Sequence, residues 1–347
     1  MKTTIQLSIP GALLVALGWL AHDPAPAQVP DKLPVVEKAT HKAFTEKLAD
    51  DVSFEMVPIP GGAFMMGSPD SEKGRGSDEG PQHPVQIKPF WMGKFEVRWD
   101  EYDYFWLKRP GGPPPRKIPE KTDKLPDALT SPTPTYEDPT FGHCKDGKTG
   151  MPCLGITHHA AMEYCRWLQD KTKKAYRLPT EAEWEWACRA GTTTAFSFGD
   201  DPKQLGDYAW IDDNADERSH KVGEKKPNPW GLYDMHGNVA EWCLDRYKKD
   251  FYADQPTTKL TLLPFNPPTE NRYPYVARGG SWIDTPEKCR SAARRFSDKQ
   301  WLKLDPQRPQ SIWWMTSADY VGFRLVLPVE EDPRLKSIRS KVTWWSN

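Results

Sequence analysis

Proline is the residue that most restricts what this chain can fold into. The sequence has 35 prolines among 347 residues, about twice ordinary usage. Because proline lacks a backbone N–H and fixes φ, it is poorly tolerated inside helices and central strands. The chain also has 16 tryptophans, whose large side chains can hold irregular segments in place. Together these residues predict a loop-rich fold and argue against a helical bundle or a doubly wound α/β sheet.

The charged residues argue against a nucleic-acid-binding protein. Lys and Arg number 47 and Asp and Glu number 48, which gives a formal net charge of -1. Proteins that bind nucleic acid usually present a basic face, and this balance gives no sign of one. The chain shows no internal repeat and no domain-sized linker, so we expect a single domain over residues 52–329.

The first 27 residues follow the order of a secretory signal. Lys2 precedes an apolar stretch over residues 5–21, and residues 25–27 have the small-x-small form of a cleavage site. The alternative is an uncleaved anchor, but Pro10 and Gly11 interrupt the apolar stretch. We therefore expect export to the periplasm or the extracellular space, with no membrane span after cleavage. In such an oxidising compartment, paired cysteines form disulfides.

The rest of the chain divides into a linker, a domain and a tail. Residues 28–51 are polar and predict a linker with one helical turn, and residues 330–347 predict a C-terminal tail. Inside the domain, residues 109–156 are a proline-rich insertion. Irregular segments of this length are usually functional or disordered.

Local patterns predict a few short helices and strands within the domain. Thr157 is a suitable N-cap for a helix with an apolar stripe. Thr180 and Glu183 have the spacing of a capping box at the start of a second helix, and an aromatic helix is expected over residues 100–107. Alternation predicts strands at 54–60, 63–67, 85–91, 275–282 and 322–327. The fold class is therefore α+β, as one irregular, loop-rich domain.

Five phrases in order carry a resemblance to a known family. They are Pro60–Ser68, Arg177–Glu185, Gly231–Trp242, Arg278–Trp282 and Gly322–Arg324. In this order the chain resembles the formylglycine-generating enzyme, or sulfatase-modifying factor, family over roughly residues 52–329. The resemblance implies a mixed fold akin to C-type lectins. Some members of the family it resembles oxidise a cysteine of a sulfatase to formylglycine with copper and dioxygen, and others only bind.

The resemblance fails at the family's two copper-binding cysteines. Counted without gaps from the phrase Arg278–Trp282, Asp284 stands where the first cysteine belongs and Cys289 where the second belongs. Aligned backwards from Arg290, Cys289 falls out of register as well. Two thiolates suit Cu(I), whereas a carboxylate is a hard ligand. Ala240 also replaces a family tryptophan. We therefore expect no copper site.

Cys289 has two alternative interpretations. Nearby Lys288, Arg290 and Arg294 would favour a thiolate and hence a reactive thiol. The resemblance instead implies a disulfide, because some relatives bridge a cysteine at the position of Cys188 to this strand. We favour the bridge between Cys188 and Cys289. A second, local pair of Cys144 and Cys153 is expected, with Cys165 and Cys243 buried and reduced.

A calcium site is also implied by the resemblance. In relatives an Asn/Asp-x-x-Gly-x-x-x-Glu phrase binds Ca²⁺, and the matching positions are Asp234, Gly237, Val239 and Glu241. Two carboxylates and two carbonyl oxygens are donors that Ca²⁺ prefers. The alternative is a structural turn whose acids accept hydrogen bonds from the backbone. A separate metal centre at His158 and His159, completed by another histidine, is the weaker hypothesis, because adjacent helical residues point to different faces.

These features support three functions. The first is a calcium-stabilised binding or scaffold module for a peptide, glycan or small molecule, with a groove lined by the proline-rich insertion and tryptophans. Those tryptophans could equally be core residues; they are Trp301, Trp313 and Trp314. The second is an enzyme acting on an exported sulfatase with the Cys-x-Pro-x-Arg signature, through a rebuilt site. That site would use Ser281, Asp284 and Cys289. The third is an oxidoreductase that matures a secreted metabolite.

Overall fold

The computed structural model describes residues 29–107, 142–144, 147–306, 308–336, 338–343 and 346. The predicted export signal and most of the proline-rich insertion lie outside the described residues. Within them, no helix has both the length and the apolar character needed to cross a membrane.

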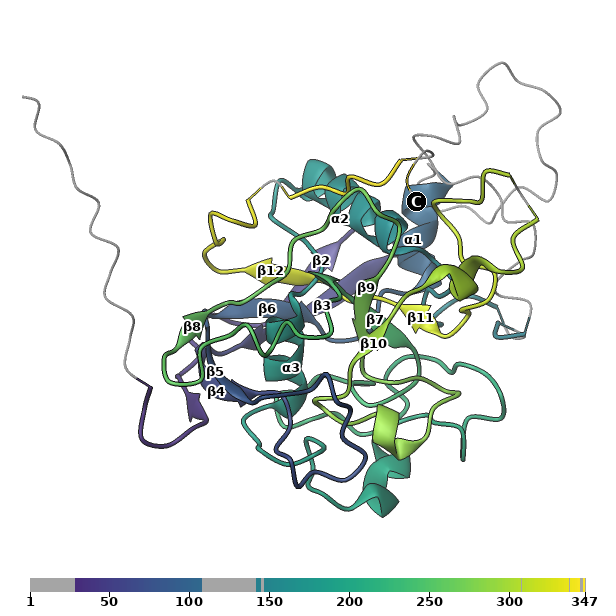
Figure 1. Cartoon of the computed structure of the whole chain (residues 1–347). Coiled ribbons are helices and arrows are strands. Elements are labelled where there is room, and N and C mark those ends of the chain that lie inside the picture. The colour runs from purple at the N-terminus through teal and green to yellow at the C-terminus, as the bar shows by residue number, and fades with distance from the viewer. Residues whose placement is uncertain are drawn as a thin grey trace, which may run out of the picture.

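The described strands form three small sheets of four strands each (Figure 1). The first sheet has the order β1 (Val35–Val36), β4 (Gly62–Met66), β5 (His83–Ile87) and β8 (Thr261–Leu262). The second has the order β10 (Arg295–Phe296), β9 (Tyr275–Arg278), β7 (Ala240–Arg246) and β11 (Val321–Gly322). The third has the order β12 (Val326–Pro328), β6 (Phe90–Gly93), β3 (Ser53–Ile59) and β2 (Phe44–Lys47). All pairs are antiparallel except β5 with β8 and β7 with β11.

The helices begin where the sequence predicts them. They are α1 (Trp99–Trp106), α2 (His158–Thr172) and α3 (Glu181–Arg189), with 3-10 turns η1 (Pro202–Asp207), η2 (Pro286–Lys288) and η3 (Lys299–Leu302). At α2 the Thr157 side chain accepts a hydrogen bond from the Ala160 amide. At α3, Thr180 and Glu183 form the expected capping box. The α+β class and the loop-rich single domain are confirmed.

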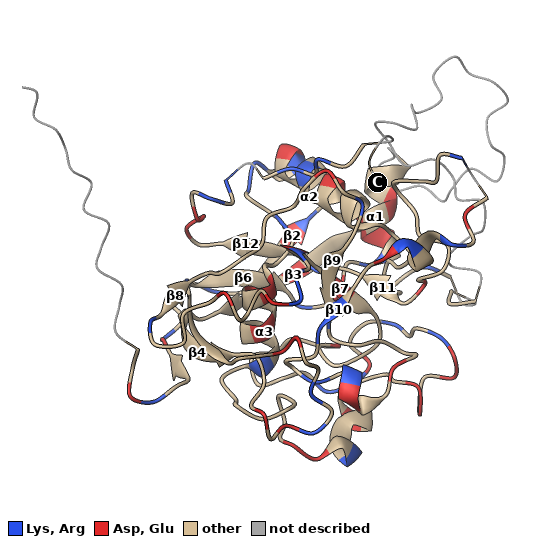
Figure 2. Cartoon of the chain, in the orientation of Figure 1, with Lys and Arg blue, Asp and Glu red and all other residues tan. Residues whose placement is uncertain are grey.

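Helix α3 is central to the core. It packs against β4 and β5 of the first sheet and against β7 and β9 of the second, and Trp184 and Trp186 on it are completely buried. Glu181 and Glu185 pair with the buried Arg278 of β9, each at 2.7 Å. Buried pairs of this kind are costly to break because the remaining charge is left without a partner. Outside the core, charges of both signs share the same loops (Figure 2).

Three local predictions are wrong. The expected strand at 322–327 is divided between β11 and β12, which belong to different sheets. Residues 28–51 carry no helical turn in their described part; they supply β1 and β2, which join the edges of two sheets. The expected strand at 85–91 is divided into β5 and β6, because the chain leaves the first sheet at Lys88 and Pro89 and enters the third.

Candidate functional site

Asp284, in the turn after β9, is held by two side chains. Ser281 Oγ donates a hydrogen bond to Asp284 Oδ2 at 2.5 Å. Arg295 of β10 forms an ion pair with Asp284 Oδ1 and lies over the Tyr320 ring, 4.8 Å from its centroid. Both oxygens of the Asp284 carboxylate therefore have a partner, and the carboxylate has a neutralising charge beside it.

Cys289 lies close to this turn, but its thiol is enclosed. The residue is completely buried and belongs to an apolar cluster with Phe196, Leu205 and Ile211. Its Sγ packs against Gly280, where a Cβ would come within 2.4 Å of the sulfur. Burial raises the pKa of the Cys289 thiol well above its ordinary value, and the Asp284 carboxylate adds to this effect. The expected thiolate is therefore disfavoured, despite the basic residues nearby in sequence.

The expected disulfide between Cys188 and Cys289 is absent, and both residues are free thiols. Cys188 Sγ lies 3.6 Å from Ser291 Oγ and 3.8 Å from both ring nitrogens of His236. The His236 Nδ1 lies 2.8 Å from the Cys289 carbonyl oxygen. The two sulfurs thus pack against different neighbours. Cys153, the expected partner of Cys144, is likewise a free and completely buried thiol.

Glu241 of β7, an expected calcium ligand, is bound to a buried arginine. Arg324 donates to both carboxylate oxygens at 2.6 Å, and the Trp184 indole donates to Oε2 at 2.7 Å. Glu241 and Arg324 are completely buried. Oε2 therefore accepts two hydrogen bonds, whereas Oε1 accepts one and keeps acceptor capacity.

Glu96 is the residue of this region that the sequence patterns missed. It follows β6 and is completely buried, and its Oε1 accepts a hydrogen bond from the Asn238 side chain. Its Oε2 and the Oδ1 of Asp234 are both buried without a donor group as partner. The two carboxyl groups instead lie within hydrogen-bond reach of each other, so that one can hold a proton that the other accepts. Burial raises the pKa of Glu96 well above its usual range, and Asp234 raises it further. Burial likewise raises the pKa of Asp234 to about 6.

The four charged groups of this region do not balance. Glu96, Asp234 and Glu241 would carry three negative charges when ionised, against the single positive charge of Arg324. Unpaired charges in a buried site are costly, so the region requires bound protons or a bound cation. We call Glu96, Asp234, Glu241 and Arg324 the carboxylate cluster. No group of three or more His, Cys, Asp or Glu in the described part of the chain has a metal-holding arrangement, so any cation here would also need backbone oxygens.

The histidines do not meet in one place. His158 Nε2 donates to the Cys243 carbonyl at 3.0 Å, and the neighbouring ring of His159 lies 2.7 Å from Ser340 Oγ. His143 contacts Asp319, and His236 lies at Cys289. His158 and His159 are both buried, and a shared metal centre has no geometric basis among these residues.

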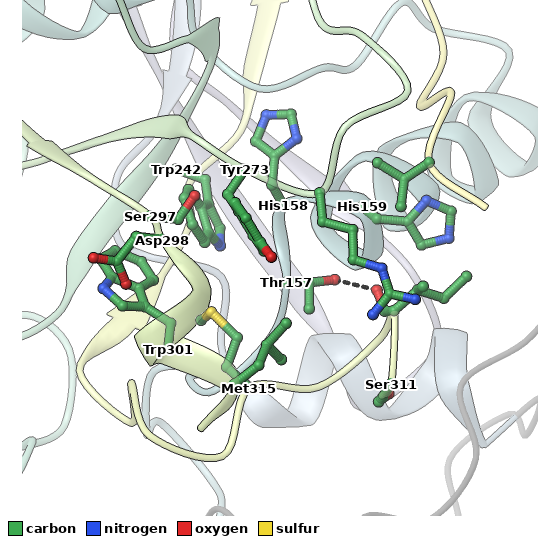
Figure 3. A pocket seen from close by; sticks show the side chains of 14 residues that line it. Thr157, His158, His159, Trp242, Tyr273, Ser297, Asp298, Trp301, Ser311 and Met315 are labelled. Atoms are coloured by element: carbon green, nitrogen blue, oxygen red, sulfur yellow. Dashed lines mark hydrogen bonds between the residues drawn. The ribbon is translucent and has the colours of Figure 1, made fainter. Parts of the chain in front are cut away.

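The predicted tryptophan groove is not exposed. Trp313 and Trp314 are buried in the core, and Trp301 is 8% exposed. Trp301 instead lines a small pocket with Trp242, Tyr273 and Met315, beside Thr157 at the start of α2 (Figure 3). Its volume is about 30 Å³, room for one or two water molecules. A larger cavity of about 460 Å³ lies between the loop at 69–73 and η2.

Comparison with known proteins identifies the family. The sulfatase-modifying factor enzyme 1-like domain matches residues 42–328, which is most of the chain. The chain belongs to this family.

Members of the sulfatase-modifying factor family that resemble this chain have different names. The chain is 27% identical to the formylglycine-generating enzyme of Mycobacterium tuberculosis, covering 78% of this chain and 97% of the relative. It is 29% identical to the serine/threonine-protein kinase pkn1 of Chlamydia pneumoniae over 75% of this chain, but it spans only 38% of that protein. The solved structure of PvdO from Pseudomonas aeruginosa is 27% identical with a TM-score of 0.60, covering 84% of this chain and all of PvdO.

The family's copper site does not fit the residues found here. Only one thiol, that of Cys289, is near the required position, and it is enclosed by Gly280 and apolar side chains. The other position is Asp284, a hard ligand already paired with Arg295. Ala240, at the position of the family tryptophan, is buried in β7, and its methyl group cannot take the place of an indole ring.

The family's calcium position fits better. Asp234 Oδ1 and Glu96 Oε2 are buried oxygens that no donor group of the protein reaches, and Ca²⁺ takes six to eight oxygen ligands that include backbone carbonyls. A divalent cation would also balance the carboxylate cluster. The fit differs from the prediction in one respect: Glu96 adds a carboxylate, while Glu241 is already neutralised by Arg324.

Proposed function

We propose that this chain is an exported binding or scaffold module of the sulfatase-modifying factor family, which does not carry out copper-dependent cysteine oxidation. The single observation behind this proposal is the Asp284–Arg295 ion pair beside the enclosed thiol of Cys289. A nucleophilic or metal-binding cysteine must be accessible as the thiolate. Neither Ser281 nor Asp284 supplies an alternative, because the hydroxyl donates to the carboxylate and the carboxylate is paired.

Calcium stabilisation is the second part of the proposal. Glu96 and Asp234 would hold the ion through Oε2 and Oδ1, with the carbonyls of Gly237 and Val239 as the further donors, while Glu241 stays paired with Arg324. The ion would supply positive charge and fix the loop at 234–239 against the segment after β6. Extracellular calcium-binding modules work with dissociation constants of about 10⁻⁴–10⁻³ M, so export and a structural calcium ion are mutually consistent.

An oxidation assay tests the absence of turnover. The purified protein, loaded with copper, is incubated aerobically with a Cys-x-Pro-x-Arg peptide, and the peptide is examined by mass spectrometry. We expect no mass loss on the peptide cysteine, whereas the Mycobacterium tuberculosis formylglycine-generating enzyme serves as the positive control.

The informative control is Cys289→Ala. Conversion by the natural chain that disappears in Cys289→Ala would show that a single cysteine suffices and would overturn the proposal. Equal conversion by both proteins would indicate a contaminating activity. The assay would then be repeated with metal-free peptide and buffers to remove that activity.

A further inference from the structure

A cavity of about 460 Å³ lies between three segments of the chain. They are the loop at 69–73, the bend at 193–202, and η2 with the following Arg290. In Figure 1 the dark-blue loop, the teal turn η1 and the yellow-green turn η2 lie below α3. The volume falls within the range of about 300–1,000 Å³ that is typical of sites for small organic ligands. None of the residues that line the cavity belongs to the carboxylate cluster.

Arg290 holds two walls of this cavity together. Its Nη1 pairs with Glu72 of the loop at 2.5 Å, and its Nη2 donates to the Gly74 carbonyl oxygen at 2.8 Å. Its Nε donates to the carbonyl oxygen of Glu287 in η2 at 2.9 Å. Loop and turn are in close contact, because a Cβ on Gly74 would come within 2.6 Å of Glu287 Cγ. One buried guanidinium therefore fixes the loop against η2.

The third wall, the bend at 193–202, is also fixed. The Ala195 amide donates to Asp200 Oδ1 at 2.8 Å within the bend. The Ala195 carbonyl oxygen accepts a hydrogen bond from the Ser291 amide at 2.8 Å. Because Ser291 follows Arg290 directly, the bend is joined to the residue that holds the other two walls. The cavity is therefore preformed, and a ligand would not have to order a loop in order to bind.

Two of the carboxylates that line the cavity keep an oxygen for a ligand. Glu72 uses Oε1 for Arg290, and Asp200 uses Oδ1 for the Ala195 amide. Within the described residues, no hydrogen bond reaches the second oxygen of either carboxylate. The Glu72 side chain is only 7% exposed, and burial raises the pKa of Glu72 above its ordinary value. Glu72 thus leaves a nearly buried carboxylate oxygen to the cavity.

The charges around the cavity favour a cation. Acids and bases in or directly behind its walls are Glu72, Glu79, Asp200, Glu287, Lys73 and Arg290. Arg290 shares its single positive charge between Glu72 and Glu79, at 2.5 and 2.7 Å. When all these groups are ionised, negative charges outnumber positive ones by two. A bound cation would remove this imbalance.

The acids do not gather at one point. In the part of the chain that the structure describes, no three or more His, Cys, Asp or Glu are arranged to hold a metal ion. Each wall instead carries one acid with apolar side chains beside it: Glu72 with Pro69, Asp200 with Phe196 and Pro202, and Glu287 with Pro286. Separated negative charges with apolar surface beside them match positive charges spaced along an aliphatic chain.

The available oxygens also favour ammonium over guanidinium groups. A guanidinium binds best through both oxygens of one carboxylate, but Glu72 and Asp200 each already use one oxygen within the protein. An ammonium group is a compact charge with three N–H donors and can pair with single oxygens.

We propose that this cavity binds a linear aliphatic polyamine. Its ammonium groups pair with the acids of the three walls, and its methylene chain packs on the proline rings and on Phe196. Glu72 is the main anchor, because its carboxylate is the most enclosed of the three. This assignment rests on the proposed binding function and names the ligand class of the module.

Calorimetric titration of the full chain with spermidine, at a fixed calcium concentration, tests the proposal. Affinity should rise with the number of ammonium groups, from butylamine through putrescine to spermidine, and should fall as salt is added. Glu72→Gln should weaken spermidine binding at least tenfold, because a hydrogen bond to a charged group contributes about that factor or more. Glu270→Gln removes an exposed acid that does not line the cavity and should leave the affinity unchanged.

Thr193→Arg is the second cavity variant, in case Glu72→Gln does not fold. Thr193 is exposed and lines the cavity, so the change adds a competing positive charge without removing a contact of Arg290. It should also weaken spermidine binding at least tenfold. Melting curves establish that each variant is folded.

The polyamine site is overturned if spermidine does not bind, or if it binds the natural chain and the folded cavity variants equally. Equal affinity for butylamine and spermidine, or displacement of spermidine by Mg²⁺ at the same concentration, would also overturn it. A tetralysine peptide that binds more tightly than spermidine, and is lost in Glu72→Gln, would assign the cavity to the lysines of a partner protein instead. None of these results would change the oxidation assay, whereas peptide oxidation would overturn the proposed function and leave the spermidine result intact.

Discussion

The position of the family's copper site and the carboxylate cluster differ in how their polar groups are paired. At the copper position, Asp284 is paired with Arg295 and Ser281, and the one remaining thiol is sealed in apolar surroundings. In the carboxylate cluster, the buried oxygens Glu96 Oε2 and Asp234 Oδ1 have no donor group as partner and lie against each other's carboxyl groups. The first region is complete without a ligand, whereas the second needs a bound proton or a bound cation.

This difference lies in whether the charges of a region can neutralise one another. Asp284 carries a charge that the neighbouring Arg295 neutralises. The carboxylate cluster has three acids and one arginine, so it cannot neutralise itself in the same way. Sensitivity to added metal should therefore be confined to the carboxylate cluster, and the following predictions test that contrast.

The largest effect is expected from Arg324→Met. Removing one partner of a buried ion pair costs about 3–5 kcal/mol, because Glu241 would remain buried without its counter-charge. Urea denaturation of the variant and the natural chain measures the free energy of unfolding. A loss below 1 kcal/mol would contradict the central position of Arg324 in the carboxylate cluster.

Removal of calcium should have the next largest effect. A ligand at a hundredfold excess over its dissociation constant adds about 2.7 kcal/mol to stability, so chelation should lower the melting temperature of a domain of this size by roughly 4–5 °C. Differential scanning calorimetry with and without EGTA measures the shift. Glu96→Gln and Asp234→Asn should abolish the response, while Asp213→Asn, which removes an exposed acid outside the cluster, should retain it. Identical curves in chelator and in calcium would remove the site.

Acid should destabilise the protein through histidines that belong to neither region. Burial lowers the pKa of His158 to about 3 and of His159 to about 4, against an ordinary value of 6.5. The unfolded chain therefore takes up protons first, and stability present above pH 6.5 is lost as the pH falls towards these values. At pH 5, each of these histidines should cost about 2 kcal/mol. Urea denaturation at pH 7.5 and 5 should show a smaller loss for His158→Phe than for the natural chain; equal losses would contradict this assignment.

The smallest effect is expected from Asp284→Ala. The side chain of Arg295 is 22% exposed, so water can solvate it after the change, and the loss should be about 1 kcal/mol. Calcium should stabilise this variant as much as the natural chain, which separates the two regions.

Alkylation of Cys289 checks the same region. In the folded natural chain the thiol should resist iodoacetamide, and in urea it should be labelled without prior reduction. Rapid labelling of the native protein would restore the reactive-thiol hypothesis. Labelling in urea only after a reductant is added would instead restore the disulfide with Cys188.

Local features of the fold were predictable because their causes are local. Thr157, Thr180 and Glu183 cap their helices through groups within a few residues along the chain, and the spacing of such groups is visible in a sequence. The family phrases identified the α+β domain in the same way. The prediction for residues 28–51 failed because a polar composition does not distinguish a linker from an edge strand. Strands β1 and β2 form by pairing with β4 and β3, which lie outside this segment.

The sequence by itself determined the family and the helix starts, and through the resemblance it predicted that Asp284 stands where a copper-binding cysteine belongs. Only the tertiary structure decided that Cys289 is enclosed, that Glu96 meets Asp234, and that the tail reaches His159. The physical reason is that burial and charge pairing depend on segments far apart in the chain. No spacing rule relates Glu96 to Asp234, or Ser340 to the start of α2; packing of the core brings them together and sets the electrostatic environment of each group.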